Sequence, residues 1–133
     1  MEESVELSRK ISRTEITIGI LLAAVVGFVI WTQYEDVMAQ HRDSSRKVAI
    51  NAIRANLEEV IYPQHSAYPE TLTPNMFSAT DVALLTDQHG VFINKTGSEY
   101  RYEPSSCSGG LCQHYVLSTV LEKEAPFVQT NQR

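Results

Sequence analysis

Apolar and polar positions alternate in blocks along this chain, and the first block is the longest. Residues 16–31 read ITIGILLAAVVGFVIW, with no charged residue and only Thr17 as a clearly polar member. The run falls just short of the about 17 to 25 apolar residues usual for a helix that crosses a bilayer. Trp31 and Tyr34 follow it closely, and both residue types favour the membrane interface. The pattern therefore predicts a membrane-spanning helix over residues 16–34.

Two other interpretations of the apolar run stay open. A buried core helix would need a domain that surrounds it, and the rest of the chain offers only roughly 70 to 85 residues for a core. A cleavable signal peptide fits the small-residue cut site at Val37-Met38-Ala39 and would free a secreted domain that begins near Gln40. The spanning helix explains the length and the flanking aromatic residues best.

The helical pattern continues beyond the apolar run. Residues 32–47 are polar with good helix formers, and we expect them to be solvated in a monomer or covered by other copies of the chain. Pro63 then predicts a helix end at Tyr62. The pattern therefore predicts one helix over residues 15–62. Apolar residues return in its last part at steps that place them on one face, namely Ile50, Ile53, Leu57, Val60 and Ile61.

Residues 63–133 form a small head in this scheme. A proline-rich loop over 63–75 and an ambiguous short helix over 76–86 precede three short strand candidates. Pro104 is expected to close the second strand, and Phe127 is the one possible anchor of a loose C-terminal tail. The fold class that follows is α+β, with a long N-terminal helix packed on a small antiparallel sheet. The strand candidates cover residues 91–93, 99–103 and 115–121, and the tail covers 124–133.

The two cysteines, Cys107 and Cys112, lie in the sequence CSGGLC between the second and third strand candidates. Their spacing is too long for a CxxC redox motif, and one pair without partner ligands makes a poor zinc site. A structural disulfide that closes a hairpin fits better than two free thiols. It would require an oxidising compartment.

Charge supports an orientation and argues against one class of function. Residues 1–14 carry both signs of charge and are expected to be a leader or a cytoplasmic tail. Arg9, Lys10 and Arg13 lie nearer to the apolar run than the first basic residue on its other side, Arg42, which favours a cytoplasmic N-terminus and an extracytoplasmic head. The net charge of −5 argues against a nucleic-acid protein with a basic surface.

The residue types that carry catalysis are present but scattered. The four histidines do not pair with one another or with cysteine at the spacing of metal ligands, and motifs for nucleophilic or phosphate chemistry are missing. We therefore predict no enzyme activity, no metal and no cofactor. Asn94-Lys95-Thr96 matches the acceptor pattern for N-glycosylation, whose use depends on the host. The histidines are His41, His65, His89 and His114.

These features together resemble a known family, the type IV pilins and the pseudopilins of type II secretion. Glu15 stands directly before ITIGILLAAVVGFVI, as a glutamate does in that family, and the long helix leads into a head with the segments LEEVIYPQHSAYPETLT, EYRYEP and YVLSTVLE. The resemblance covers nearly the whole chain in architecture. Two positions depart from the pattern. Lys10 stands where the family has a small residue before the cleaved bond, and the apolar run has no proline.

The resemblance implies a set of roles for particular residues. Leader cleavage would fall between Lys10 and Ile11, and Glu15 would pair with a positive group of a neighbouring subunit, either its new N-terminus or its Arg13. The alternative for Glu15 is a helix cap, because a carboxylate near the positive end of a helix stabilises it by about 0.3 to 1 kcal/mol. Both roles stay open at this point.

The function that the resemblance implies is a structural subunit of a pilus-like filament, for adhesion, motility or DNA uptake. Its partners would be copies of itself or related pilin subunits, membrane lipid before assembly, and the pilus assembly machinery. Alternatives are a pseudopilin of a type II secretion system and a single-pass membrane protein with a binding ectodomain.

Overall fold

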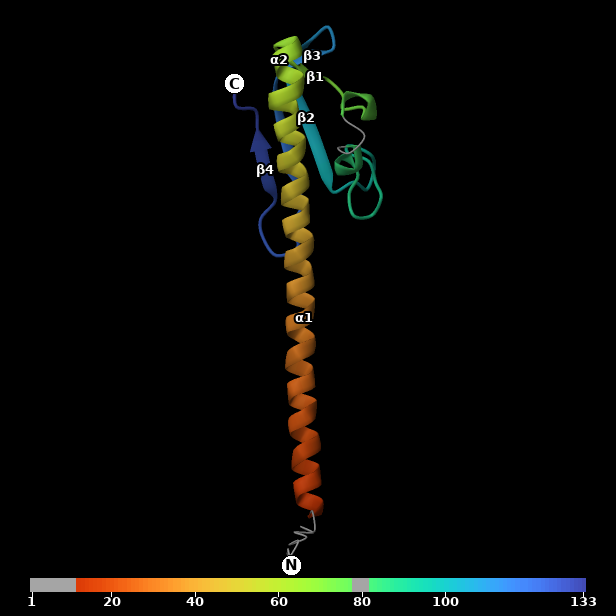
Figure 1. The fold of residues 1–133 in the computed structure, drawn as a ribbon, viewed down its shortest axis with the longest axis vertical. Helices are drawn as coiled ribbons and strands as arrows, with labels where there is room; N and C mark the ends of the chain where they lie inside the picture. Colours follow the sequence, from red (N-terminus) through yellow and green to blue (C-terminus); the bar gives the residue numbers. More distant parts are fainter. Residues whose placement is uncertain (1–11, 78–81) are drawn as a thin grey trace, which may run out of the picture. The chain divides into compact units, whose positions relative to one another are not determined.

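The structure is a computed structural model that describes residues 12–77 and 82–133. The chain divides into two compact units, Met1–Met38 and Ala39–Arg133. Helix α1, Arg13–Asn56, begins in the first unit and ends in the second (Figure 1). In the first unit α1 is the only regular element among the described residues.

The sequence predicts that the helix ends at Tyr62, and this prediction is wrong. The helix continues through a π-helical turn, Leu57–Ile61, into α2, Tyr62–His65, and ends at Ser66 in the left-handed conformation with φ of 51°. In an ideal α-helix the ring of Pro63 would clash with the carbonyl group four residues earlier. The wider turn directly before Pro63 removes that clash, since its hydrogen bonds span five residues instead of four.

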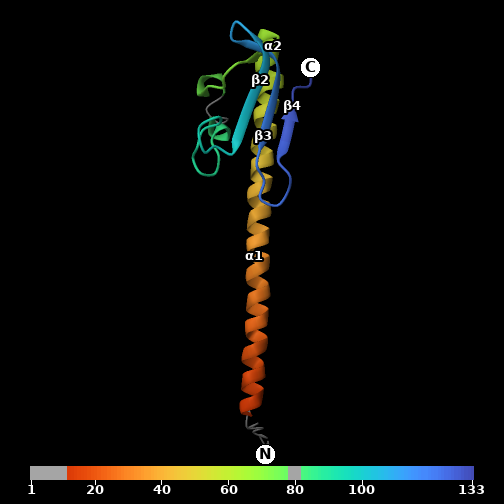
Figure 2. The ribbon, with the colours of Figure 1, turned by 180° about the vertical axis from the view of Figure 1, so that it is seen from behind.

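The second unit has two layers, the helix and a four-stranded antiparallel sheet (Figure 2). The central strand of the sheet is β3, Leu111–Thr119, which pairs along its whole length with β2, Tyr100–Ser108. On its other side β3 pairs at its start with β1, Tyr68–Pro69, and at its end with β4, Phe127–Thr130. Every strand of the sheet is thus joined through β3.

The predicted hairpin across the cysteines is confirmed, but its strands are longer than predicted. β2 runs through Pro104, because a strand with a partner on one side only tolerates a missing N–H group. Gly109 and Gly110 make a two-residue turn with φ of 61° and 83°, a conformation that favours glycine at both positions. The predicted disulfide joins Cys107 to Cys112, which lie directly opposite each other on β2 and β3.

Two other predictions about the head were wrong, and a third segment was left ambiguous. The C-terminal segment is not a loose tail, because β4 pairs with β3. The strand candidate at 91–93 forms only an isolated bridge between Thr86 and Phe92. The ambiguous helix over 76–86 is replaced by two 3₁₀ turns, Pro74–Met76 and Val82–Leu85, while residues 78–81 lie outside the described residues.

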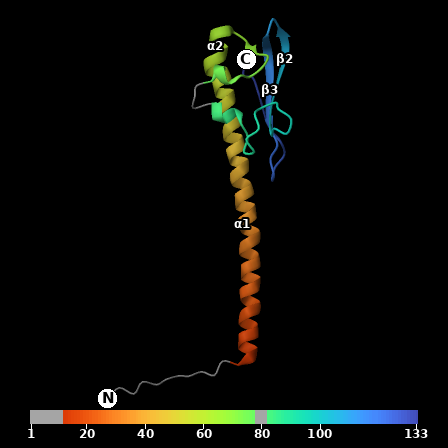
Figure 3. The same ribbon diagram turned by 90° about the vertical axis from the view of Figure 1, so that its right-hand side faces the viewer.

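The core lies between the helix and the sheet, which form two layers in side view (Figure 3). The predicted apolar face of the helix is buried except at Val60, which is 44% exposed. Leu57 is fully buried, which contributes about 1.5 to 3 kcal/mol. The α+β fold class is therefore confirmed, with the long helix packed on a small antiparallel sheet. The sheet contributes Tyr68, Tyr100, Tyr102, Tyr115 and Leu117 to this core.

Candidate assembly surface

The apolar part of α1 is uncovered on every side in the first unit. All residues from Ser12 to Met38 are exposed, and Leu21 and Leu22 are 67% and 61% exposed. The helix is long and apolar enough to cross a membrane, and none of that stretch is covered by the described residues. Burial of such a set of large apolar side chains is worth on the order of 20 kcal/mol. This surface therefore needs lipid or other protein around it.

The two predicted assembly residues, Arg13 and Glu15, both lie exposed in the first turn of α1. Ser12 stands directly before the helix, and its backbone N–H donates a hydrogen bond to Glu15 Oε2 at 2.9 Å. The backbone N–H of Thr14 donates to Ser12 Oγ at 3.4 Å. This is half of a capping box, in which Glu15 satisfies a donor that the helix leaves without a partner. The predicted cleavage residues, Lys10 and Ile11, lie outside the described residues.

In the second unit α1 has another exposed surface, on its face away from the sheet. Val48 is 65% exposed, and Ser45 and Ala55 are exposed as well. These positions recur at the spacing of one helix face, and their side chains are small or short. Small side chains allow another helix to approach closely.

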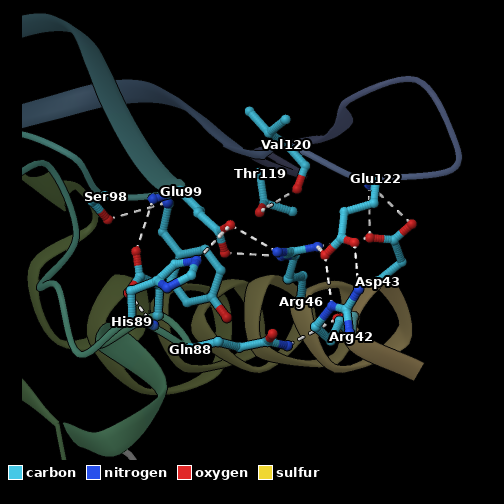
Figure 4. Close-up of polar contacts among 12 residues, drawn as sticks. Arg42, Asp43, Arg46, Gln88, His89, Ser98, Glu99, Thr119, Val120 and Glu122 are labelled. Carbon is cyan, nitrogen blue, oxygen red and sulfur yellow. Dashed lines mark hydrogen bonds and ion pairs between the residues drawn. The ribbon is translucent and has the colours of Figure 1, made fainter. Parts of the chain in front are cut away.

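The opposite face of the same part of α1 carries a buried ionic cluster (Figure 4). Arg46 is 3% exposed, and its guanidinium donates two hydrogen bonds to Glu99, at 2.7 and 2.9 Å. It donates further hydrogen bonds to Asp43 at 2.8 Å and to Glu122 at 2.9 Å. One side chain of the helix thus joins two separate segments of the head, the residue directly before β2 and the β3–β4 connection.

Asp43 completes this cluster. Its carboxylate accepts hydrogen bonds from the backbone N–H groups of Glu122 and Lys123, at distances between 2.9 and 3.1 Å. Arg42 adds a two-point contact to Glu122, at 2.6 and 2.8 Å. Helix and head are therefore held together by oriented, charge-assisted bonds at the end of the second unit where α1 enters it.

These contacts change the protonation of the carboxyl groups involved. Burial by itself would raise the pKa of Asp43, but the N–H groups of Glu122 and Lys123, together with Arg46, outweigh burial and lower it. Hydrogen bonds from Arg42 and Arg46 lower the pKa of Glu122 to about 2. The pKa of Asp87 is also lowered, because backbone N–H donors from three residues of the neighbouring loop outweigh its burial. All three groups are ionised at neutral pH.

Glu58 is a second buried carboxylate, within the π-helical turn. It accepts hydrogen bonds from the hydroxyl groups of Tyr68 and Tyr115, at distances between 2.9 and 3.1 Å. The backbone N–H of Gln132 donates to it as well, at 3.1 Å. Burial raises the pKa of both tyrosines, and their hydrogen bonds to Glu58 raise it further. Glu58 therefore anchors the segment after β4 to the helix.

Asn94 has a structural use that bears on the predicted glycosylation motif. Its amide nitrogen donates to the carbonyl oxygen of Tyr102 and its amide oxygen accepts from the N–H of Tyr102, both at 2.8 Å. This side chain therefore covers the outer edge of β2 as another strand would. An amide engaged at both atoms is a poor acceptor for a glycan.

Sequence reasoning missed the ionic cluster, although a signal for it is present. Asp43 and Arg46 continue the buried helix face toward the N-terminus at steps of three and four, in register with Ile50 and Ile53. The prediction that residues 32–47 are solvated or covered by other copies is thus wrong at Ala39, Asp43 and Arg46, which are buried within the second unit. Two charged residues on an apolar face indicate a buried ion pair.

Within residues 12–77 and 82–133, no three histidine, cysteine, aspartate or glutamate side chains gather as metal ligands would. Comparison of the chain with protein-family models, with curated proteins and with solved structures gave no match. The resemblance to pilins thus rests on the residues themselves.

Proposed function

We propose that this protein is a structural subunit of a type IV pilus-like filament, either a pilin or a minor pilin. Its N-terminal helix would hold it in the membrane before assembly. The same helix would pack against the helices of other subunits afterwards. A pseudopilin of a secretion system would use these parts in the same way.

One observation carries this proposal. The apolar surface of α1 is uncovered on all sides, and the same helix continues into a unit in which one of its faces is fully packed. A subunit that leaves the bilayer needs a second apolar environment for its helix, and a bundle of like helices provides one. Burial of about 1,000 Å² of apolar surface is worth roughly 25 kcal/mol before entropy costs, which is enough to compensate for the loss of lipid contacts.

The orientation that we propose places the N-terminus in the cytoplasm and the head outside. Basic residues near the N-terminal end of the apolar run support it. The Cys107–Cys112 disulfide supports it as well, because disulfides persist in oxidising compartments.

Mechanical shearing of cells that express the native chain tests the proposal. We expect the chain in sheared surface fibres, and its intact mass shows whether the leader is cleaved between Lys10 and Ile11. Recovery in the membrane fraction alone, never in fibres, would overturn the proposal.

Glu15→Gln separates the two roles of Glu15. Glutamine preserves the capping contact with Ser12 but removes the charge that could pair with a neighbouring subunit. In a filament that uses the charge, we expect the yield of sheared fibres to fall at least about tenfold, which corresponds to about 1.4 kcal/mol. Membrane content of the variant, measured in parallel, should stay at the level of the unchanged chain. An unchanged fibre yield would mean that Glu15 acts only as a helix cap.

The capping contact also favours a second candidate function, a single-pass membrane protein with a binding ectodomain. In that case Glu15 serves its own helix, and the apolar surface stays in lipid. Such a protein would be found as a monomer or dimer after detergent extraction and would be missing from fibres.

A further inference from the structure

A cavity of about 440 Å³ opens at the end of the second unit opposite to Ala39. It lies between the last turns of the helix, β1, the 3₁₀ turn Pro74–Met76 and the β2–β3 turn. Residue 39 and the helix residues that line the cavity are about 30 Å apart along the helix. The size falls in the range of about 300 to 1,000 Å³ that is usual for ligand sites.

The frame of the cavity is fixed by covalent and hydrogen bonds. The Cys107–Cys112 disulfide and the two-glycine turn hold the tip of the hairpin. The backbone N–H of Glu70 donates to the carbonyl oxygen of Gly110 at 3.1 Å, which ties this tip to the segment after β1. A site with a fixed frame loses little conformational entropy when it binds a partner.

The lining combines an apolar interior with amide and imidazole groups. Buried Ile61 and Pro69 form part of the wall, while Met76 and Leu111 are 39% and 40% exposed at its rim. Val60, another exposed large apolar residue of the second unit, lines the same cavity. An apolar patch that surrounds a cavity marks an interaction site more strongly than isolated exposed residues do.

The polar members of the lining are the side-chain amides of Gln64 and Asn75 and the imidazole of His65. All three residues are exposed, and their side chains make no hydrogen bond to any other residue that the structure describes. Among the residues that the structure describes, no lysine, arginine, aspartate or glutamate lines the cavity. An amide side chain offers a donor and an acceptor together, which matches a peptide group.

We propose that this cavity binds an uncharged, extended peptide segment of a different protein, with one aliphatic side chain inserted between Met76 and Leu111. In the part of the chain that the structure describes, the lining has no fixed charge for an anion or cation to pair with. The residues of the lining that the structure describes include no phenylalanine, tyrosine or tryptophan on which a sugar could stack. Aliphatic contacts with two amides at the rim fit a peptide with an apolar side chain.

The chain's own segments offer no better occupant among the described residues. The uncharged stretch 125–132 is taken up by β4 and by the bond from Gln132 to Glu58. A second cavity of about 430 Å³ beside Glu58 has charged walls, including Arg54 and Glu59, and its buried carboxylate already has three partners. The cavity at the hairpin tip therefore differs from the cavity beside Glu58 in the chemistry of its walls. It would serve a filament subunit and a single-pass protein equally, so the inference does not depend on the proposed function.

Methyl NMR of the full chain in lipid nanodiscs tests the proposal directly. The probe is N-acetyl-leucine methylamide, a neutral peptide unit with one aliphatic side chain. We expect saturable shifts of the Met76 and Leu111 methyl signals, with no shift of Met38 in the first unit. N-acetylglycine methylamide, which lacks the side chain, and 3-methylbutanol, which lacks the peptide groups, should bind at least about tenfold more weakly.

Two matched variants complete the experiment. Leu111→Glu places a charge at the rim and should abolish the saturable shifts, whereas Val128→Glu on β4, at a site of similar exposure, should leave them intact. Gln64→Leu, at an exposed helix position, replaces Leu111→Glu if that variant fails to fold. It should weaken binding of the probe at least about tenfold.

Three results would overturn the proposal. One is the absence of saturable shifts in the unchanged chain. Another is equal binding of 3-methylbutanol, which would indicate a site for small apolar molecules instead of peptides. The third is a shift of the Met76 and Leu111 signals when the concentration of the chain alone is raised, which would identify a second copy as the occupant.

Discussion

Helix α1 presents two different surfaces along its length. In the first unit, Leu21 and Leu22 are 67% and 61% exposed, so neighbouring positions on different faces are equally uncovered. In the second unit, Val48 is 65% exposed while Ile50, two residues later, is fully buried. The second part of the helix has its partner within the chain, and the first part has none among the described residues. A surface that is apolar on all sides indicates an environment that other molecules supply.

The largest effect should come from a charge in the uncovered part. Val25→Arg places a cation near the middle of the apolar run, at a cost of about 2.5 to 3.5 kcal/mol at the bilayer centre. We expect loss of the variant from sheared fibres and a reduced amount in membranes, both measured by immunoblot. Val48→Arg, on the exposed face in the second unit, is the control for membrane content and should be retained in membranes like the unchanged chain. Equal fibre and membrane content of the two variants would remove the contrast between the two surfaces.

The next largest effect concerns the ionic cluster that joins helix and head. Arg46→Met leaves the buried carboxylate of Asp43 and the partly buried carboxylate of Glu99 without their cation, and removal of one partner from a buried pair costs about 3 to 5 kcal/mol. Urea unfolding of the detergent-solubilised chain measures this loss. Lys47→Met breaks a solvent-exposed pair with Glu124 and should cost less than about 1 kcal/mol. Similar losses for both variants would show that the cluster is not what fastens the helix.

The two faces of the helix in the second unit can be compared by truncation. Leu57→Ala removes a fully buried side chain and should lower the free energy of unfolding by about 2 to 5 kcal/mol. Val60→Ala, three residues later and 44% exposed, should change it by less than about 1 kcal/mol. The same urea titration reports both values. A large loss for Val60→Ala would place that residue in a core that the structure does not show.

Acid should weaken the head and leave the apolar part of the helix unaffected. The pKa values of Asp43, Asp87 and Glu122 are lower in the folded chain than their ordinary values of 3.8, 3.8 and 4.5. Below these values the unfolded chain binds more protons than the folded chain, so stability is complete above about pH 4.5 and falls as the pH drops toward 2. We expect the melting temperature, followed by near-UV circular dichroism, to decrease over this window.

Asp43→Asn is the matched variant for the acid experiment, because it removes one of the three groups that take up protons. Its melting temperature should be lower at neutral pH and should depend less steeply on pH. A melting temperature that stays constant from pH 7 to pH 2.5 in the unchanged chain would contradict the assigned protonation.

The long-range pattern of the sequence was enough to predict the helix, its apolar run, the buried positions from Ile50 to Ile61 and the cysteine hairpin. These features depend on periodicity and on short spacings, which a sequence displays directly. The burial of Asp43 and Arg46 was not predicted. Their partners, Glu99 and Glu122, lie more than fifty residues away along the chain, and charge on a helix usually indicates solvent.

The other misses have local physical reasons. Pro63 stays inside the helix because a π-helical turn precedes it. The rule that a helix ends before proline assumes an ideal α-helix, so it does not predict that turn. β4 contains only four residues, and its place in the sheet depends on the exposed edge of β3 and not on its own pattern. The cavity at the hairpin tip joins four separate segments, so no single stretch of sequence reveals it.

Light scattering of the purified, intact chain without detergent tests the central claim most directly. If the apolar surface of α1 depends on lipid or on other copies, removal of detergent should convert the chain into filaments or large aggregates, with no stable monomer. Intact mass must show that residues 16–31 are still attached. A monodisperse, water-soluble monomer that retains those residues would contradict the account.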